Sequence, residues 1–207
     1  MKTLKFFVLA GLSLALLSCV VSLQPLFEDR YLVFEPGLAG TWKMADSSDT
    51  WTFEKAENNE YLLIQRQAEY EADKSLSKEQ VKKAPGDAVR FRTRLGRLGG
   101  KLFFDFIPAD EGNPEVHNDL YNAHMIPAHT LARVWLEKGT LKFVFLDQDW
   151  ISHAIESGQI KLAYVKTDNW LVLTAPTQEL QAFILKYAND AKAFSAGPGE
   201  EFLLVKQ

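Results

Sequence analysis

The chain has very little cysteine and no recognisable catalytic motif. Cys19 is the only cysteine among 207 residues, so an intramolecular disulfide is excluded. The sequence contains no G-x-S-x-G, no H-E-x-x-H and no phosphate-binding loop. We therefore predict no catalytic residue and no cofactor. The sequence favours a binding or interaction protein, with a hydrolase or metal-dependent activity as the alternative.

An excess of positive charge is also missing. The chain carries 23 Lys and Arg against 27 Asp and Glu, which gives a formal net charge of −4. Without Lys2 and Lys5, which lie in the N-terminal stretch described next, the net charge becomes −6. A negative protein is poorly suited to bind nucleic acid or an anionic lipid surface by charge. We therefore expect no nucleic-acid partner.

The N-terminal apolar run is too short to cross a membrane. It extends from Phe6 to Leu17, whereas a spanning helix needs ~20 apolar residues. Lys2 and Lys5 both precede the run, and Ser18 follows it just before Cys19. A positive start, a short apolar centre and a small residue at the cleavage point are typical of a signal peptide.

This stretch resembles the lipobox of bacterial lipoproteins, with an ordinary secretory signal as the alternative. The resemblance implies lipidation of Cys19 by acyl chains such as palmitate, and hence a membrane anchor. Lipoproteins retained at the inner membrane have Asp where this chain has Val20. We expect a cell-envelope protein, in the outer membrane facing the periplasm if there are two membranes. Residues 1–18 are then a signal peptide, 19–36 a lipidated tether and 37–207 one domain.

In the body of the chain, apolar and polar residues alternate as they do in β-strands, and turn residues separate the alternating runs. We predict strands starting at Gly40 and over Thr50–Glu54, Tyr61–Arg66, Val89–Leu98, Leu102–Ile107, Thr130–Glu137, Leu141–Leu146, Ile160–Lys166, Trp170–Thr174 and Phe202–Val205. Tight hairpins join most of them, so the pairing is antiparallel. We expect a mainly β fold of about 8–10 strands, an up-and-down barrel or strongly curled sheet.

Two short helices are predicted late in the chain. One covers Trp150–Glu156 and is capped by Asp147 or Asp149. The other covers Gln178 to about Asp190 behind a Thr177 cap and has an apolar stripe. The segment from Ser22 to Pro36 is too apolar for a free linker, so we expect it to dock on the body. A further short helix is predicted over Lys78–Lys83.

The strand Val89–Leu98 carries three arginines on one predicted face, Arg90, Arg92 and Arg94. Period-two charge is typical of a sheet with one face in water. We expect these side chains to pair with acidic neighbours such as Asp105, Glu137 or Asp147, with an anion-binding site as the alternative.

Gly40-Thr41-Trp42, at the start of the first long strand, resembles the Gly-x-Trp opening of the lipocalins. Lipocalins are eight-stranded barrels that carry small apolar ligands, so the resemblance implies a calycin-type barrel and a ligand-binding role. They also cover that Trp with a late Arg. This chain has no Arg after Arg133, so either the cover is missing or Lys161 or Lys166 supplies it.

Aromatic residues are the candidate ligand-binding groups. Five side chains are expected to face an apolar pocket: Trp51, Phe53, Phe91, Tyr121 and Trp135. The alternative is that such rings simply fill the barrel, in which case the protein would dock another envelope protein. The predicted partners are thus a membrane, an apolar small molecule or lipid, and an envelope protein.

The long connection Ala109–Pro127 is the candidate loop site, because function often lies on irregular polar segments. His117 and His124 lie in it and His129 lies just beyond it. The His124 to His129 spacing fits neither one strand face nor a helix interrupted by Pro127. We therefore predict no metal site.

Overall fold

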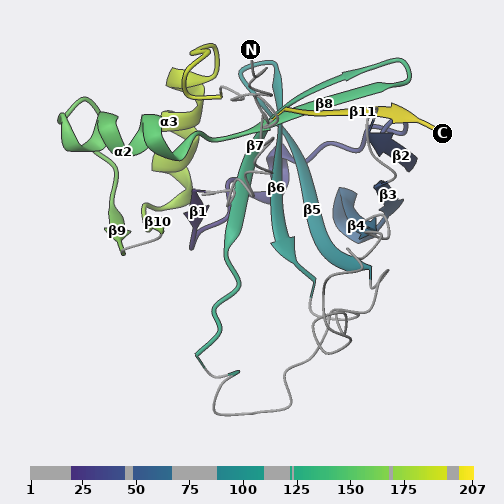
Figure 1. Cartoon of the computed structure of the whole chain (residues 1–207), viewed down its shortest axis with the longest axis horizontal. Helices are drawn as coiled ribbons and strands as arrows, with labels where there is room; N and C mark the ends of the chain where they lie inside the picture. Colours follow the sequence, from purple (N-terminus) through teal and green to yellow (C-terminus); the bar gives the residue numbers. More distant parts are fainter. Residues whose placement is uncertain are drawn as a thin grey trace, which may run out of the picture.

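A computed structural model describes residues 20–44, 49–66, 88–109, 122, 124–167, 170–194 and 201–207 (Figure 1). The predicted signal peptide, Cys19, the predicted helix over Lys78–Lys83, His117 and Tyr121 lie outside the described residues.

The described residues form a mainly β structure built around a closed, eight-stranded antiparallel barrel. The sheet order is β6-β5-β4-β3-β2-β11-β8-β7, and pairing of β6 with β7 closes it. The strands are β2 (Gly40–Met44), β3 (Thr50–Lys55), β4 (Glu60–Arg66), β5 (Val89–Leu98), β6 (Lys101–Pro108), β7 (His129–Glu137), β8 (Thr140–Phe145) and β11 (Phe202–Lys206). The predicted fold class is confirmed.

Tight turns join the strands at one end of the barrel. Gly99 and Gly100 connect β5 to β6 with φ of 54° and 76°, and Gly139 connects β7 to β8 with φ of 81°. Asn58 and Asn59, in the short helix η2 (Glu57–Asn59), also have positive φ. These conformations suit Gly and Asn. We call this the tight-turn end and the opposite end the wide end.

The C-terminal strand β11 lies between two strands that are far from it in sequence. Leu204 is opposite Met44 of β2 on one side and Leu141 of β8 on the other. The eight barrel strands therefore follow one another as neighbours in chain order, and β11 closes the predicted up-and-down barrel by pairing with the first barrel strand, β2.

A small branch leaves the barrel at the start of β7. There β1 (Val21–Ser22) pairs antiparallel with His129 and Thr130, and parallel with β10 (Leu171–Leu173). β10 pairs in turn with β9 (Tyr164–Lys166), which confirms the predicted hairpin but with shorter strands. The branch and helices α2 and α3 lie on one side of the barrel in Figure 1.

The two helices are α2 (Gln148–Glu156) and α3 (Thr177–Tyr187). Asp147 caps α2, accepting a hydrogen bond from Trp150 N. The predicted Thr177 cap is wrong, since Pro176 is the N-cap of α3 and Thr177 Oγ1 donates to Pro25 O at 2.7 Å. That hydroxyl joins the helix to the N-terminal segment.

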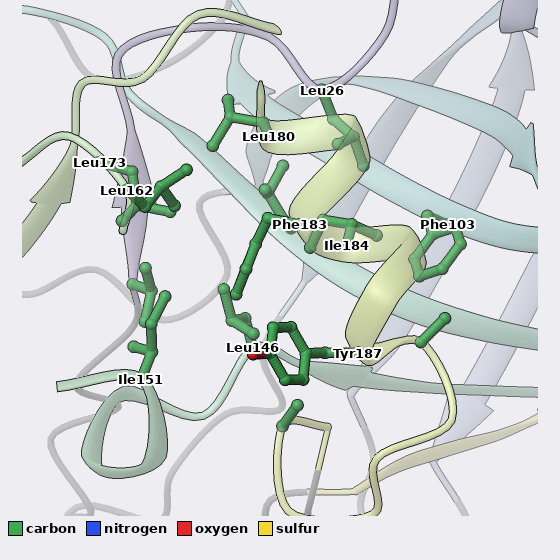
Figure 2. Packing of buried hydrophobic residues seen from close by; sticks show 14 of the residues in the cluster. Leu26, Phe103, Leu146, Ile151, Leu162, Leu173, Leu180, Phe183, Ile184 and Tyr187 are labelled. Atoms are coloured by element: carbon green, nitrogen blue, oxygen red, sulfur yellow. The ribbon is translucent and has the colours of Figure 1, made fainter. Parts of the chain in front are cut away.

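Two hydrophobic cores share the barrel wall. The inner core lies inside the barrel, and the outer core lies between the barrel wall, α2, α3 and the N-terminal segment. Phe183, Ile184 and Tyr187 of α3 belong to the outer core together with Phe103 of the wall, and Ile184 lies on the side of the helix nearer Phe103 (Figure 2). Phe104, one residue further along β6, belongs to the inner core. β6 is therefore buried on both faces.

The N-terminal segment 22–38 docks on the barrel and on α3, as expected. Leu26 N donates to Asp105 of β6, and Arg94 of β5 donates to Phe27 O. Val33 N donates to Leu95 O, and Gln181 of α3 donates to Leu26 O. The segment also includes the short helix η1 (Asp29–Tyr31).

Arg92, Arg94 and Arg97 of β5 do pair with acidic side chains, but these are not the acidic residues named in the prediction. Arg94 pairs with Asp29 at 2.6 Å and Glu60 at 3.0 Å, while Arg97 pairs with Glu35 at 2.6 Å. Arg92 lies 3.5 Å from the same Glu60. The expectation of a fully wet face was wrong as well, because Arg94 is buried beneath the N-terminal segment.

Trp42 of the Gly-Thr-Trp motif is fully buried, and its Nε1 donates to Leu38 O at 2.8 Å. The cation over its ring is Lys206 of β11, whose Nζ lies 5.3 Å from the ring centroid and donates to Gly37 O. The expected candidates do not fill this role in the described structure, where Lys166 pairs with Glu156 and Lys161 is exposed.

Candidate functional site

The wide end of the barrel is the candidate binding site. Its rim holds four partly buried apolar side chains that pack against the inner core: Met44, Phe91, Phe145 and Phe202. All four lie near strand ends that the register brings to the same end. The tight-turn end, by contrast, is covered by the N-terminal segment through Val33 and Phe34. Among the described residues, the wide end therefore carries the apolar rim.

Trp51 lies just inside this rim. Its ring is 5.4 Å from Phe143 and 5.5 Å from Phe202, and those two rings stack at 4.7 Å. Phe53, two residues further in, stacks on Phe104 at 5.7 Å. Edge and offset contacts at these distances stabilise aromatic clusters. Trp51 and Phe53 thus face the interior and Phe91 lies at its rim.

Within the described structure, two polar atoms inside this aromatic interior have no hydrogen-bond partner. They are Trp51 Nε1 and Thr93 Oγ1, and both side chains are buried. Thr93 faces inward with Leu95, and is opposite Tyr61 on β4. Buried donors are nearly always satisfied, and leaving one unmade costs about 1–3 kcal/mol. An acceptor from a bound molecule would remove that cost.

The expectation that Trp135 faces the barrel interior is wrong. Its side chain lies on the outer wall, 38% exposed, with Arg133 4.9 Å and Lys142 5.3 Å from its ring centroid. Val134 takes the inward position instead. Trp135 lines a surface groove of about 450 Å³ between β7, β8 and the end of α3.

Arg133 lies at the base of this groove. It donates from Nη1 to Leu102 O and Val134 O, and it lies between the rings of Phe103 and Trp135. Burial lowers the pKa of Arg133. Asp190 and Glu201 also line the groove, and Glu201 pairs with Lys142. The charges around the groove are therefore mixed, which gives no preference for an anionic ligand.

The predicted histidine site is not assembled within the described residues. His129 is buried on β7 and its Nδ1 lies 2.6 Å from Asp105 Oδ1, whereas His124 is exposed. In the part of the chain that the structure describes, no three His, Cys, Asp or Glu side chains are grouped as metal ligands. His129 is better explained as a structural partner of Asp105.

Sequence reasoning named Asp105 only as a possible partner of the β5 arginines, and it missed the buried hydroxyl of Thr93. Asp105 interrupts the apolar run of β6, and a charged residue in a strand buried on both faces indicates a buried polar contact. Thr93 alternates with Phe91 and Leu95 on the same face, which marks a hydroxyl among apolar neighbours.

The fold and site define a closed eight-stranded barrel with an aromatic interior and a wide apolar end. No protein-family model matches the chain, and neither do any characterised proteins or solved structures compared with it. Among the described residues, none of the helices combines the length and apolar character needed to cross a membrane.

Proposed function

We propose that this protein is an envelope-anchored lipoprotein whose lipocalin-like barrel binds an apolar small molecule or lipid. Cys19 carries the acyl chains, and the barrel faces the periplasm from the outer membrane where two membranes exist. The observation that carries the binding role is the pair of unpartnered polar atoms, Trp51 Nε1 and Thr93 Oγ1, in an otherwise aromatic interior.

These atoms suggest the chemistry of the ligand. Most of its surface would be apolar, because the interior and rim are built from aromatic and aliphatic side chains. At least one hydrogen-bond acceptor would meet the Trp51 indole N–H, since indole nitrogen only donates. A carbonyl or ester on an acyl or isoprenoid-like chain fits this description.

The binding role is tested with two Trp variants. Trp51→Phe removes the N–H but keeps an aromatic ring, so it should weaken binding of an apolar fluorescent ester probe about 5- to 10-fold. Trp135→Phe is the matched control, because Trp135 lies on the outer wall, and it should leave the affinity unchanged. Native mass spectrometry of gently extracted protein should show a co-purifying ligand. Equal affinities in both variants, together with a ligand-free mass, would count against the binding role.

A non-enzymatic docking role is the second candidate. The close ring contacts of the inner core, such as Phe143 on Phe202 at 4.7 Å, favour a filled barrel that presents only its surface. Crosslinking in intact cells should then yield one discrete envelope-protein product. Products of the chain with itself alone would speak against this role.

A further inference from the structure

The branch of β1, β9 and β10 has one buried face and one open face. Val20, Leu171 and Leu173 face the outer core. Alternation along the strands turns the next residues the other way, and Val21, Val172 and Val165 lie side by side in one row. Leu23 lies two residues after Val21 and Trp170 lies two residues before Val172, so both belong to the same face as this row. We call these five residues the branch face: Val21, Leu23, Val165, Trp170 and Val172.

The branch face is apolar and open to solvent. Val165 is 53% exposed, Trp170 48% and Leu23 39%. The polar residues that alternate onto this face are threonines: Thr130, Thr167 and Thr174. No charged residue of the three described strands alternates onto it; the nearest one by alternation is the exposed Lys161, which precedes β9. Contiguous apolar surface of this kind marks an interaction site.

The position of the N-terminal segment indicates what covers this face. Val20 is only 4% exposed and β1 begins at Val21, so no flexible residues separate Cys19 from the body of the protein. Consecutive Cα atoms are about 3.8 Å apart, so a lipid attached to the residue before Val20 would be held next to the branch. Because β10 is parallel to β1, the turn holding Trp170 lies at the end of the branch where the chain arrives from Cys19.

We propose that the branch face rests on the phospholipid bilayer that holds the acyl chains of Cys19. This inference rests on the lipidation proposed above. Short attachment brings the face to the membrane surface, where Trp170 at the headgroup level is favoured and the described strands place no acidic side chain that anionic lipid would repel. The barrel is then held in one orientation instead of turning freely on a tether.

The single cysteine makes a direct test available. In the acylated protein the Cys19 sulfur is a thioether, so an introduced cysteine is the only free thiol. Val165→Cys places that thiol on the branch face. Val205→Cys is the matched control, because Val205 is 46% exposed but lies on β11 of the barrel wall. Each full-length variant is labelled with an environment-sensitive fluorophore and reconstituted in phosphatidylcholine vesicles that contain nitroxide-labelled lipid.

We expect at least threefold stronger nitroxide quenching at position 165 than at position 205, with a blue-shifted emission at position 165 only. Equal quenching at the two positions, in protein whose mass shows acylation, would overturn the bilayer contact while leaving the anchor in place. A mass without acyl chains would refute the lipidation itself. A blue-shifted emission at position 165 in soluble, vesicle-free Cys19→Ser protein would show that the face is covered without a membrane. That result would assign the face to a second copy of the chain and also overturn the proposal.

Discussion

Asp105 and His129 form a buried pair on the outer wall of the barrel, with Oδ1 and Nδ1 2.6 Å apart. The second carboxylate oxygen of Asp105 accepts the backbone N–H of Leu26 at 2.9 Å. One carboxylate thus joins β6, β7 and the N-terminal segment. Both of its oxygens are occupied, which is what a charge with no exposed surface requires.

Asp105→Ala should lower the free energy of unfolding by about 2–4 kcal/mol, because it leaves His129 and the Leu26 N–H buried without their partner. The midpoint of urea unfolding, followed by far-ultraviolet circular dichroism, measures the loss. Glu156→Ala is the control, since Glu156 pairs with Lys166 at the surface and its removal should leave the midpoint unchanged. A similar midpoint for both variants would contradict the structural role of Asp105.

Gly96 of β5 leaves space for the ring of Phe27. A Cβ at position 96 would lie 2.3–2.5 Å from three Phe27 ring atoms, so Gly96→Ala should push the N-terminal segment away from the barrel. We expect a loss of about 2–3 kcal/mol in urea unfolding, in the range of overpacked cores. Faster proteolysis near residue 27 should accompany it.

Gly37→Ala provides the control for Gly96, because no atom lies within 4 Å of a Cβ added there. Its stability should match that of the parent or exceed it slightly. The double variant Gly96→Ala with Phe27→Leu should regain part of the lost stability. Without any recovery, the Phe27 contact is not the cause.

Because the hydroxyl of Tyr61 is buried, the folded protein should become less stable in alkaline solution. Burial raises the pKa of Tyr61 to about 12, and its hydroxyl donates to Glu35 O and accepts from Glu35 N. An unfolded chain ionises its tyrosines near pH 10, so the folded state binds more protons between pH 10 and 12. Stability from this group is therefore complete below pH 10 and falls by about 2–3 kcal/mol up to pH 12.

Unfolding free energies measured at several pH values, in the parent and in Tyr61→Phe, isolate this effect. The variant should be less stable at pH 8, because it loses both hydrogen bonds, but its stability should fall less steeply above pH 10. Ultraviolet titration should show one tyrosine in the parent that ionises later than the others. Parallel pH profiles for the two proteins would refute the assignment.

Replacing Thr93 and Thr52 with Val should change the free energy of unfolding in opposite directions. In ligand-free protein, Thr93→Val removes a buried hydroxyl without a partner and should raise the free energy of unfolding by about 1 kcal/mol. Thr52→Val breaks the 3.1 Å contact with the Thr41 hydroxyl and should lower it by about 1 kcal/mol. Urea unfolding of both variants checks the signs. A destabilised Thr93→Val would mean that Thr93 has a partner.

The local pattern predicted the elements well. Alternating residues located all eight barrel strands, and Asn and Gly located the turns where positive φ is required. The position of β1 was not predictable, since a strand of two residues has no period to read. The Arg94 partners were also missed, because Asp29 and Glu60 reach it only after the N-terminal segment folds over β5.

The candidate site was only partly predictable for a related reason. β7 has buried residues on both faces, Leu131 toward the outer core and Val134 toward the inner core. Alternation alone separates two faces but does not say which one is inside a barrel. Trp135 was therefore placed inside on its aromatic character, whereas the interior position belongs to its neighbour.

The insertion of β11 between β2 and β8 has a consequence for biogenesis. While the polypeptide emerges from a ribosome or a translocation channel, β2 and β8 present unpaired edges until residues 202–206 appear. The barrel cannot close until the last described residues are synthesised. A nascent chain that stops before Phe202 therefore exposes two unpaired strand edges, which are prone to aggregation. Chaperone protection during synthesis would matter most in that interval.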